Sequence, residues 1–205
     1  MILGRTNRSF APVWFRPISG LDDEATASAI VEAGRIEPTT IVDASSQPLL
    51  WGGLLRGFRG GFLARSARDL ERATGEAHAA DLVEAHLIET LSSLGRESVE
   101  VYCVRVRARM APETTVGALQ ALERARSEGM VHAFGILPED PAAGRELWER
   151  HDAFEVALLP QGSGLEGFAT QRRCGIVFLG KANANPRLIE VSSGDEVRRS
   201  LEAAP

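Results

Sequence analysis

The chain has 205 residues, of which 44% are hydrophobic and 25% are charged, and its formal net charge is −5. This length and composition are typical of one globular domain, expected to span residues 1–205. The negative charge argues against nucleic acid as a partner. The absence of a long apolar run argues against a membrane span or a secretory signal, so a cytoplasmic location is expected.

Short β-branched runs alternate with longer helical runs, which is the pattern of βα units around a parallel sheet. Strands are expected at residues 40–43, 61–65, 99–104, 132–136, 154–159, 175–179 and 187–191. Helices are expected at residues 21–33, 49–56, 83–94, 115–128, 141–150 and 194–203. Gly34, Gly95 and Gly129 each follow a helical segment, as glycines that end helices do. The sequence therefore predicts an α/β domain.

Two short segments hold much of the aromatic content, Trp14–Pro17 and Leu49–Phe58. The second is more apolar than the outer face of a helix in an α/β barrel usually is. It predicts either a core helix or, as the alternative, an exposed patch around Trp51 that binds a partner and favours a homodimer.

A few residue types carry most of the chemical information. Neither the two cysteines, Cys103 and Cys174, nor the histidines have the spacing of metal ligands, so no metal site is predicted. The cysteines are interpreted as intracellular thiols. Lysine and arginine together number 23, yet Lys181 is the one lysine of the chain. A lone lysine can act as a base or form a Schiff base, which arginine cannot do.

The strongest pattern lies in the middle of the chain. LIETLSSLGRESVEVYCVR (87–105) and ETTVGALQALERARSEGMVHAFGI (113–136) resemble the third helix to the fifth strand of an aldo-keto reductase. AIVEAGRIEPTTIVDASS (29–46) and FEVALLP (154–160) are similar to further parts of that family. The resemblance implies a (β/α)8 TIM barrel, trimmed because the connection GKANANPR (180–187) is too short for a full helix.

Aldo-keto reductases reduce carbonyls with NADPH through an Asp, Tyr, Lys and His tetrad at the barrel mouth. Asp43 matches the aspartate, whereas Arg65 stands at the lysine position and Arg105 at the histidine position. Pro48 or a neighbour stands at the tyrosine position, and the one tyrosine of the chain, Tyr102, falls inside a predicted strand. The resemblance therefore implies a member that lacks most of the tetrad.

The residues implied to hold the cofactor differ too. Leu137 and Pro138 replace the Ser-Asn pair that holds the nicotinamide amide, and the stacking tyrosine position falls near Gly180 or Lys181. At the adenosine phosphate, Ser192, Ser193 and Arg198 are plausible contacts, but Ser200 replaces the asparagine. We therefore expect no cofactor, with NADPH as the alternative.

Strand ends of a TIM barrel meet at the mouth where such folds place their chemistry. Asp43 and Lys181 are the candidate catalytic residues, and Arg65, Arg105 and Gln161 are the candidate substrate-binding residues. Three cations and one carboxylate predict an electropositive pocket that suits a carboxylate or a phosphate. The alternative for Asp43 is a structural ion pair with Arg65.

Three functions follow from these patterns, and the sequence does not decide whether the protein is an enzyme. The leading hypothesis is a barrel that binds a small anionic molecule without nicotinamide and catalyses a non-redox step such as dehydration, isomerisation, cyclisation or decarboxylation. The second is a non-catalytic interaction or scaffold protein. The third is NADPH-dependent carbonyl reduction with a relocated proton donor.

Overall fold

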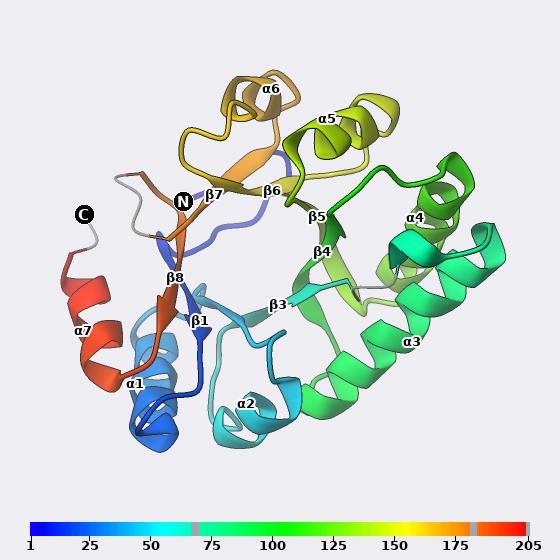
Figure 1. Cartoon of the computed structure of the whole chain (residues 1–205). Helices are drawn as coiled ribbons and strands as arrows, with labels where there is room; N and C mark the ends of the chain where they lie inside the picture. Colours follow the sequence, from blue (N-terminus) through cyan, green and yellow to red (C-terminus); the bar gives the residue numbers. More distant parts are fainter. Residues whose placement is uncertain (67–69, 181–183, 204–205) are drawn as a thin grey trace.

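The computed structural model describes residues 1–66, 70–180 and 184–203. Eight parallel strands pair in sequence order, and β8 pairs with β1, so that the sheet closes into a barrel with helices outside the ring (Figure 1). The predicted α/β fold, a trimmed (β/α)8 TIM barrel, is confirmed.

The strands are short, as is usual in such barrels. Their bounds are β1 Val13–Pro17, β2 Ile41–Asp43, β3 Gly61–Arg65, β4 Val99–Val106, β5 Val131–Pro138, β6 Val156–Pro160, β7 Gly175–Leu179 and β8 Arg187–Val191. The helices are α1 Asp23–Ile36, α2 Pro48–Leu54, α3 Glu76–Leu94, α4 Pro112–Ser127, α5 Pro141–Arg150, α6 Glu166–Gln171 and α7 Gly194–Glu202, and a 3-10 turn spans Leu70–Arg72.

The structure departs from the predicted elements in a few places. The sequence analysis assigned neither β1 nor the short helix α6. Helix α1 continues through Gly34 instead of stopping there. This glycine serves packing, because a Cβ atom would lie 2.5 Å from Cε2 of Phe58. By contrast Gly95 ends α3 in the left-handed region (φ 62°), as predicted.

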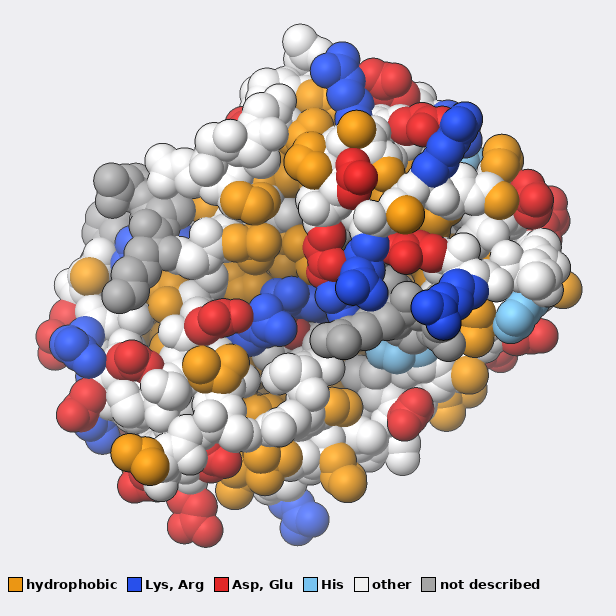
Figure 2. All heavy atoms as spheres, in the orientation of Figure 1, with side chains coloured by type: hydrophobic (Ala, Val, Ile, Leu, Met, Phe, Trp, Pro, Cys, Tyr) orange, Lys and Arg blue, Asp and Glu red, His pale blue; other side chains and the backbone are white. Residues whose placement is uncertain are grey.

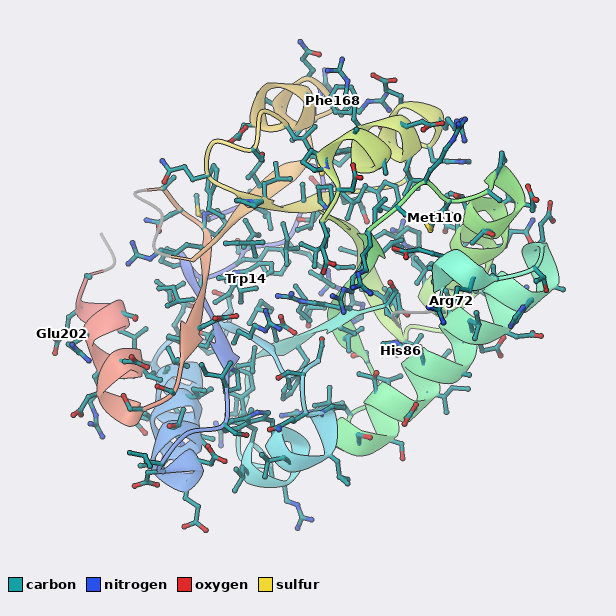
Figure 3. All side chains as sticks on the ribbon, viewed as in Figure 1. Trp14, Arg72, His86, Met110, Phe168 and Glu202 are labelled. Atoms are coloured by element: carbon teal, nitrogen blue, oxygen red, sulfur yellow. The ribbon has the colours of Figure 1, made fainter. Side chains whose placement is uncertain are left out.

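The core has two layers, because neighbouring residues of a strand point to opposite faces of the sheet. Trp14, Leu63 and Cys103 belong to the layer inside the barrel, and Figure 3 shows Trp14 within the ring of strands. Phe15 and Tyr102 belong to the layer between strands and helices. At the mouth, the same alternation directs Arg16, Asp43, Arg65, Arg105 and Glu190 inward.

The barrel is closed at its amino-terminal end. Leu3 and Phe10 from the segment that precedes β1 join the inner layer, and the Phe10 ring lies 5.4 Å from the Trp14 ring. Open space for a ligand is therefore expected at the opposite end, where the strands end.

The segment around Trp51 lies in the core. Trp51, Leu55 and Phe58 are almost fully buried, and Gly52 lets α2 approach the backbone of Ser93 closely. The core-helix interpretation is confirmed for these residues and Trp51 itself is not exposed, whereas the homodimer stays a prediction. Leu49 and Leu50 remain exposed on α2.

Within the described ranges, no helix is both long enough and apolar enough to span a membrane.

Candidate functional site

Asp43 and Arg65 form a buried ion pair at the ends of β2 and β3. The Asp43 side chain is 0% exposed and that of Arg65 is 8% exposed, and Oδ2 of Asp43 contacts Nη2 of Arg65. The sequence analysis placed these residues together at the mouth, and the structure does the same. The two side chains pair as the alternative expected, and whether Asp43 is catalytic or only structural stays a prediction.

Ser45 fixes the geometry of this pair. Its backbone N–H donates to Oδ1 of Asp43 (3.1 Å), its hydroxyl accepts from the backbone N–H of Arg65 (3.1 Å), and the same hydroxyl donates to the carbonyl of Leu63 (3.4 Å). The end of β2 is thereby tied to the end of β3. Ser45 has no motif of its own, so sequence reasoning missed it.

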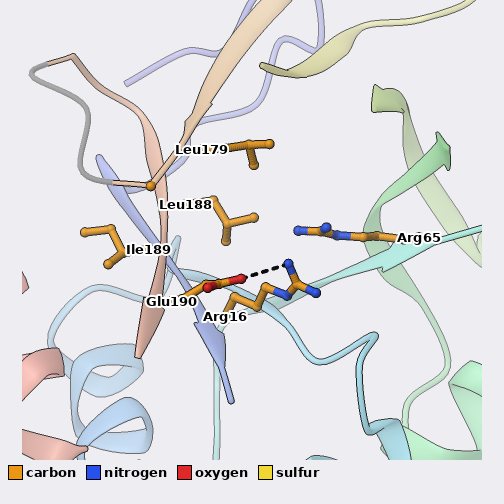
Figure 4. Close-up of a pocket in the computed structure, with 7 residues that line it drawn as sticks. Arg16, Arg65, Leu179, Leu188, Ile189 and Glu190 are labelled. Carbon is orange, nitrogen blue, oxygen red and sulfur yellow. Dashed lines mark hydrogen bonds and ion pairs between the residues drawn. The ribbon is translucent and has the colours of Figure 1, made fainter. Parts of the chain in front are cut away.

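A pocket of about 410 Å³ opens beside Arg65 at the mouth. Its lining comes from the ends of β1, β3, β7 and β8, which lie far apart in the chain: Arg16, Arg65, Leu179, Gly180, Leu188, Ile189 and Glu190. Figure 4 shows the guanidinium of Arg65 pointing into this space from one side, opposite Leu179 and Leu188. In Figure 2 charged side chains of both signs meet near the centre of this face, next to a hydrophobic hollow.

Arg65 has hydrogen-bonding capacity to spare. Its Nε and Nη2 atoms are buried and have no hydrogen-bond partner among the described residues, since the contact of Nη2 with Asp43 is an ion pair without hydrogen-bond alignment. Buried donors in proteins nearly always find an acceptor. Both atoms are closed to solvent and Nη2 touches Oδ2 of Asp43, so these two donors are not open to a ligand in the pocket.

Arg16 and Glu190 form the other charged pair of the pocket. They stand opposite each other on β1 and β8, and Nη1 of Arg16 donates to Oε1 of Glu190 (3.0 Å), as the dashed line in Figure 4 marks. Nε of Arg16 also lies 3.8 Å from Oδ2 of Asp43. Sequence reasoning missed both residues, although the alternation within β1 and β8 could have placed them inside the barrel.

The described charges of the pocket therefore balance. Arg16 and Arg65 are matched by Asp43 and Glu190, whereas the sequence predicted an excess of positive charge. Glu190 was not counted in the prediction of an electropositive mouth, and Lys181, one of its three cations, lies outside the described residues, so the electropositive mouth stays a prediction.

Arg105 lies at the mouth but outside this pocket. Its Nε and Nη2 atoms both donate to Oε1 of Glu139, at 2.9 and 2.5 Å, and Glu139 also pairs with Arg107 (3.1 Å). The backbone N–H of Arg105 donates to the hydroxyl of Ser66 (3.0 Å). These partners hold Arg105 away from the pocket that Arg65 lines, and its substrate-binding role stays a prediction.

Two other candidates are placed less fully. Gln161 lies exposed after β6 and does not line the described pocket. Lys181 lies outside the described residues, directly after Gly180 of the pocket lining, so its predicted role stays a prediction. The described residues contain no cluster of histidine, cysteine and carboxylate side chains that could hold a metal ion.

The chain's phenol and one of its thiols are buried away from the pocket lining. Tyr102 faces the helices, where its hydroxyl lies 3.0 Å from Nδ1 of His86 on α3, and burial raises the pKa of the phenol. Cys103 faces the barrel interior, and burial likewise raises the pKa of its thiol. Neither group is exposed to solvent, and neither lines the pocket as a proton donor.

Solved structures of aldo-keto reductases share this architecture. One from Brucella melitensis matches with a TM-score of 0.77 at 12% identity, covering 98% of this chain and 91% of its own. The holo form of one from Bacillus halodurans gives 0.74 at 15%, covering 99% and 90%. One from Bombyx mori in complex with NADP gives 0.62 at 13%, covering 86% and 64%.

The chain has the aldo-keto reductase fold. No family model matches the sequence, and no curated protein sequence matches it either. At 12–15% identity the likeness to the solved structures concerns the fold and not the reaction.

The nicotinamide end of the cofactor implied by this fold finds few partners here. Leu137 at the end of β5 is buried and apolar, and Pro138 has no backbone N–H to donate. The next residue, Glu139, is engaged by Arg105 and Arg107. The described residues at this strand end therefore do not fit a carboxamide.

Where the adenosine phosphate of NADPH would be expected, the backbone and side-chain donors bind a carboxylate of the chain itself. Before α7, the backbone N–H and the hydroxyl of Ser192 both donate to Oε2 of Glu196 (2.7 and 3.1 Å), and these bonds lower the pKa of that carboxyl. The Ser193 hydroxyl caps the helix by accepting from the backbone N–H of Glu196 (3.3 Å), and Arg198 pairs with Asp195. The donors that a phosphate would use are thus taken by acidic residues, and the described residues do not fit NADPH.

Proposed function

We propose that the protein binds a small anionic molecule at the mouth of its barrel and does so without NADPH. The observation that carries the proposal is Arg65, whose guanidinium lines the pocket and points into it from one side. A hydrogen bond to a charged donor contributes about 1.5–3 kcal/mol, so an anion that reaches this guanidinium is stabilised.

The cofactor-free part of the proposal rests on the residues at the two places where the nicotinamide and the adenosine phosphate of NADPH would be expected to bind. Leu137 and Pro138 offer no amide partner, and Glu196 occupies the donors of Ser192. Bringing a phosphate to that place would set it against Glu196 and Asp195, and like charges at close range repel.

Calorimetry separates this proposal from NADPH-dependent reduction. Acetate, hexanoate and inorganic phosphate serve as anion probes, and we expect at least one to bind with a weaker affinity in Arg65→Lys. The matched control is Arg105→Lys, the same change at a strand end outside the pocket, and it should leave binding unchanged. Stoichiometric micromolar binding of NADPH would overturn the cofactor-free part.

A non-redox step is the catalytic part of the proposal, and it would act through Glu190. Glu190 lines the pocket and is 58% exposed, whereas Asp43 is 0% exposed and locked by Arg65. A carboxylate beside a bound oxo acid can take a proton from the carbon next to the ketone group and return it to that carbon. Proton NMR in D2O with pyruvate as the probe tests this: the methyl C–H signal should disappear faster with the native protein than with Glu190→Gln.

A further inference from the structure

The two arginines of the pocket meet at one oxygen atom. Nη2 of Arg65 contacts Oδ2 of Asp43, and Nε of Arg16 lies 3.8 Å from the same oxygen. The Asp43 side chain is 0% exposed, so a buried carboxylate holds both guanidinium groups close together, and both residues line the pocket. An anion that reaches the guanidinium of Arg65 in the pocket therefore comes close to that of Arg16 as well.

Arg16 is the more accessible arginine, and its guanidinium has two unlike partners. Its side chain is 30% exposed, against 8% for Arg65. Nε is closed to solvent on the side of the buried Asp43, whereas Nη1 donates to Oε1 of Glu190 (3.0 Å), whose side chain is 58% exposed. One carboxylate partner of Arg16 is thus buried and the other lies in solvent.

The contact with Glu190 is the weaker of the two. An exposed ion pair contributes little, because water solvates both groups well when they separate. Arg16 is the one partner of Glu190 among the described residues, so the carboxylate loses no other bond when it turns into solvent. Asp43, in contrast, is costly to separate from its partners because it is fully buried. Glu190 is therefore the group that an incoming anion can replace.

Glu190 already places an anion in the pocket. Figure 4 shows its carboxylate beside the guanidinium of Arg16, with the dashed line joining the two. We propose that Arg16 is a second anion-binding residue of the pocket, and that the ligand anion displaces Glu190 from Nη1 of Arg16. Glu190 is then an internal competitor for the site. This inference rests on the proposed function and deepens it, since the same exchange releases the carboxylate that the proposed proton transfer uses.

Calorimetry on the full chain tests the competition, with acetate, hexanoate and inorganic phosphate as the probes. Glu190→Gln keeps the size of the side chain and removes the competing charge. It should increase the affinity for the bound probe about fivefold, the ratio that corresponds to an exposed ion pair. Glu139→Gln is the matched control, because it makes the same change in an ion pair at the mouth outside the pocket, and it should leave the affinity unchanged.

A double-mutant cycle separates competition from simple repulsion. Loss of a nearby negative charge can by itself favour an anion. Arg16→Met should weaken the probe about tenfold, and in that background Glu190→Gln should bring no further gain, because no arginine is left to release. Arg105→Met, the same change outside the pocket, should leave the affinity unchanged. If Glu190→Gln keeps its full gain in the Arg16→Met background, repulsion is the cause and the competition is overturned.

The remaining outcomes distinguish this inference from the proposed function. If Arg65→Lys weakens the probe while Arg16→Met and Glu190→Gln leave its affinity unchanged, the role of Arg16 is overturned and anion binding stands. If a probe binds Glu190→Gln alone, and Arg16→Met abolishes this binding, both are supported. If no probe binds either the native protein or Glu190→Gln, both are overturned.

Discussion

Two arginines lie near the ends of neighbouring strands at the barrel mouth, and their surroundings give them different uses. Arg65 on β3 is 8% exposed and forms an ion pair with a fully buried carboxylate, and its guanidinium lines the pocket. Arg105 on β4 is 18% exposed, and Glu139, itself 32% exposed, accepts from its Nε and Nη2 atoms. Both arginines face the barrel interior, but Arg65 is in register with Cys103, so Arg105 lies two residues further toward the mouth. Register and pairing together decide which arginine lines the pocket.

The largest effect should come from breaking the buried pair. Asp43→Asn removes the carboxylate that faces Arg65 and leaves a positive charge almost fully buried, which typically costs about 3–5 kcal/mol of unfolding free energy. Urea unfolding followed by circular dichroism measures the loss.

The double variant Asp43→Leu with Arg65→Met tests whether the unpaired buried charge causes the instability of Asp43→Asn. It removes both charges at similar volume and should recover much of the lost stability, because a buried ion pair often contributes little more than an apolar pair. A double variant as unstable as Asp43→Asn would show that the pair is not the cause.

A smaller effect is expected from the thiol beneath the buried pair. Cys103 is in register with Arg65, and burial raises the pKa of its thiol above the unfolded value. Its contribution to stability is therefore complete below the unfolded pKa of about 8.5 and decreases as pH rises above it, by about 1.4 kcal/mol per pH unit. Unfolding free energies measured at pH 8, 9 and 10 give this slope.

Cys103→Ala isolates that contribution. Cys174 and Tyr102 also have raised pKa values, so the alkaline slope should become shallower in the variant without vanishing. An identical slope in both proteins would mean that the Cys103 thiolate is accommodated in the folded state, and that the space under Arg65 is more open than described.

The barrel itself was predictable because its signals are local and repeat along the chain. The spacing of Val83, Leu87, Leu91 and Leu94 gave α3 its face, and Gly95 gave it its end. The element boundaries that were predicted wrongly depend on contacts between residues far apart in the sequence. Gly34 looked like a helix stop, but the ring of Phe58 requires the absence of a side chain there.

The candidate site was only partly predictable, for the same reason. Asp43 and Arg65 could be placed because each ends a recognisable strand. Glu190 was missed because its importance depends on β8 closing against β1, which sets it opposite Arg16. Arg105 was assigned to the pocket from its position near the end of a strand. Its partner Glu139 follows a different strand, so no local sequence pattern could show that the two residues pair.

The smallest effect should come from breaking the pair at the mouth that lies outside the pocket. Glu139→Gln removes the carboxylate shared by Arg105 and Arg107, all three of which are partly exposed. Exposed ion pairs contribute about 0–1 kcal/mol, so unfolding free energy should fall by less than about 1 kcal/mol and the affinity for the anion probes should stay the same. The comparison with Asp43→Asn uses the same carboxylate-to-amide chemistry. If Glu139→Gln instead increased anion binding, the released Arg105 would be a second anion-binding residue, and the separation between the two arginines would fail.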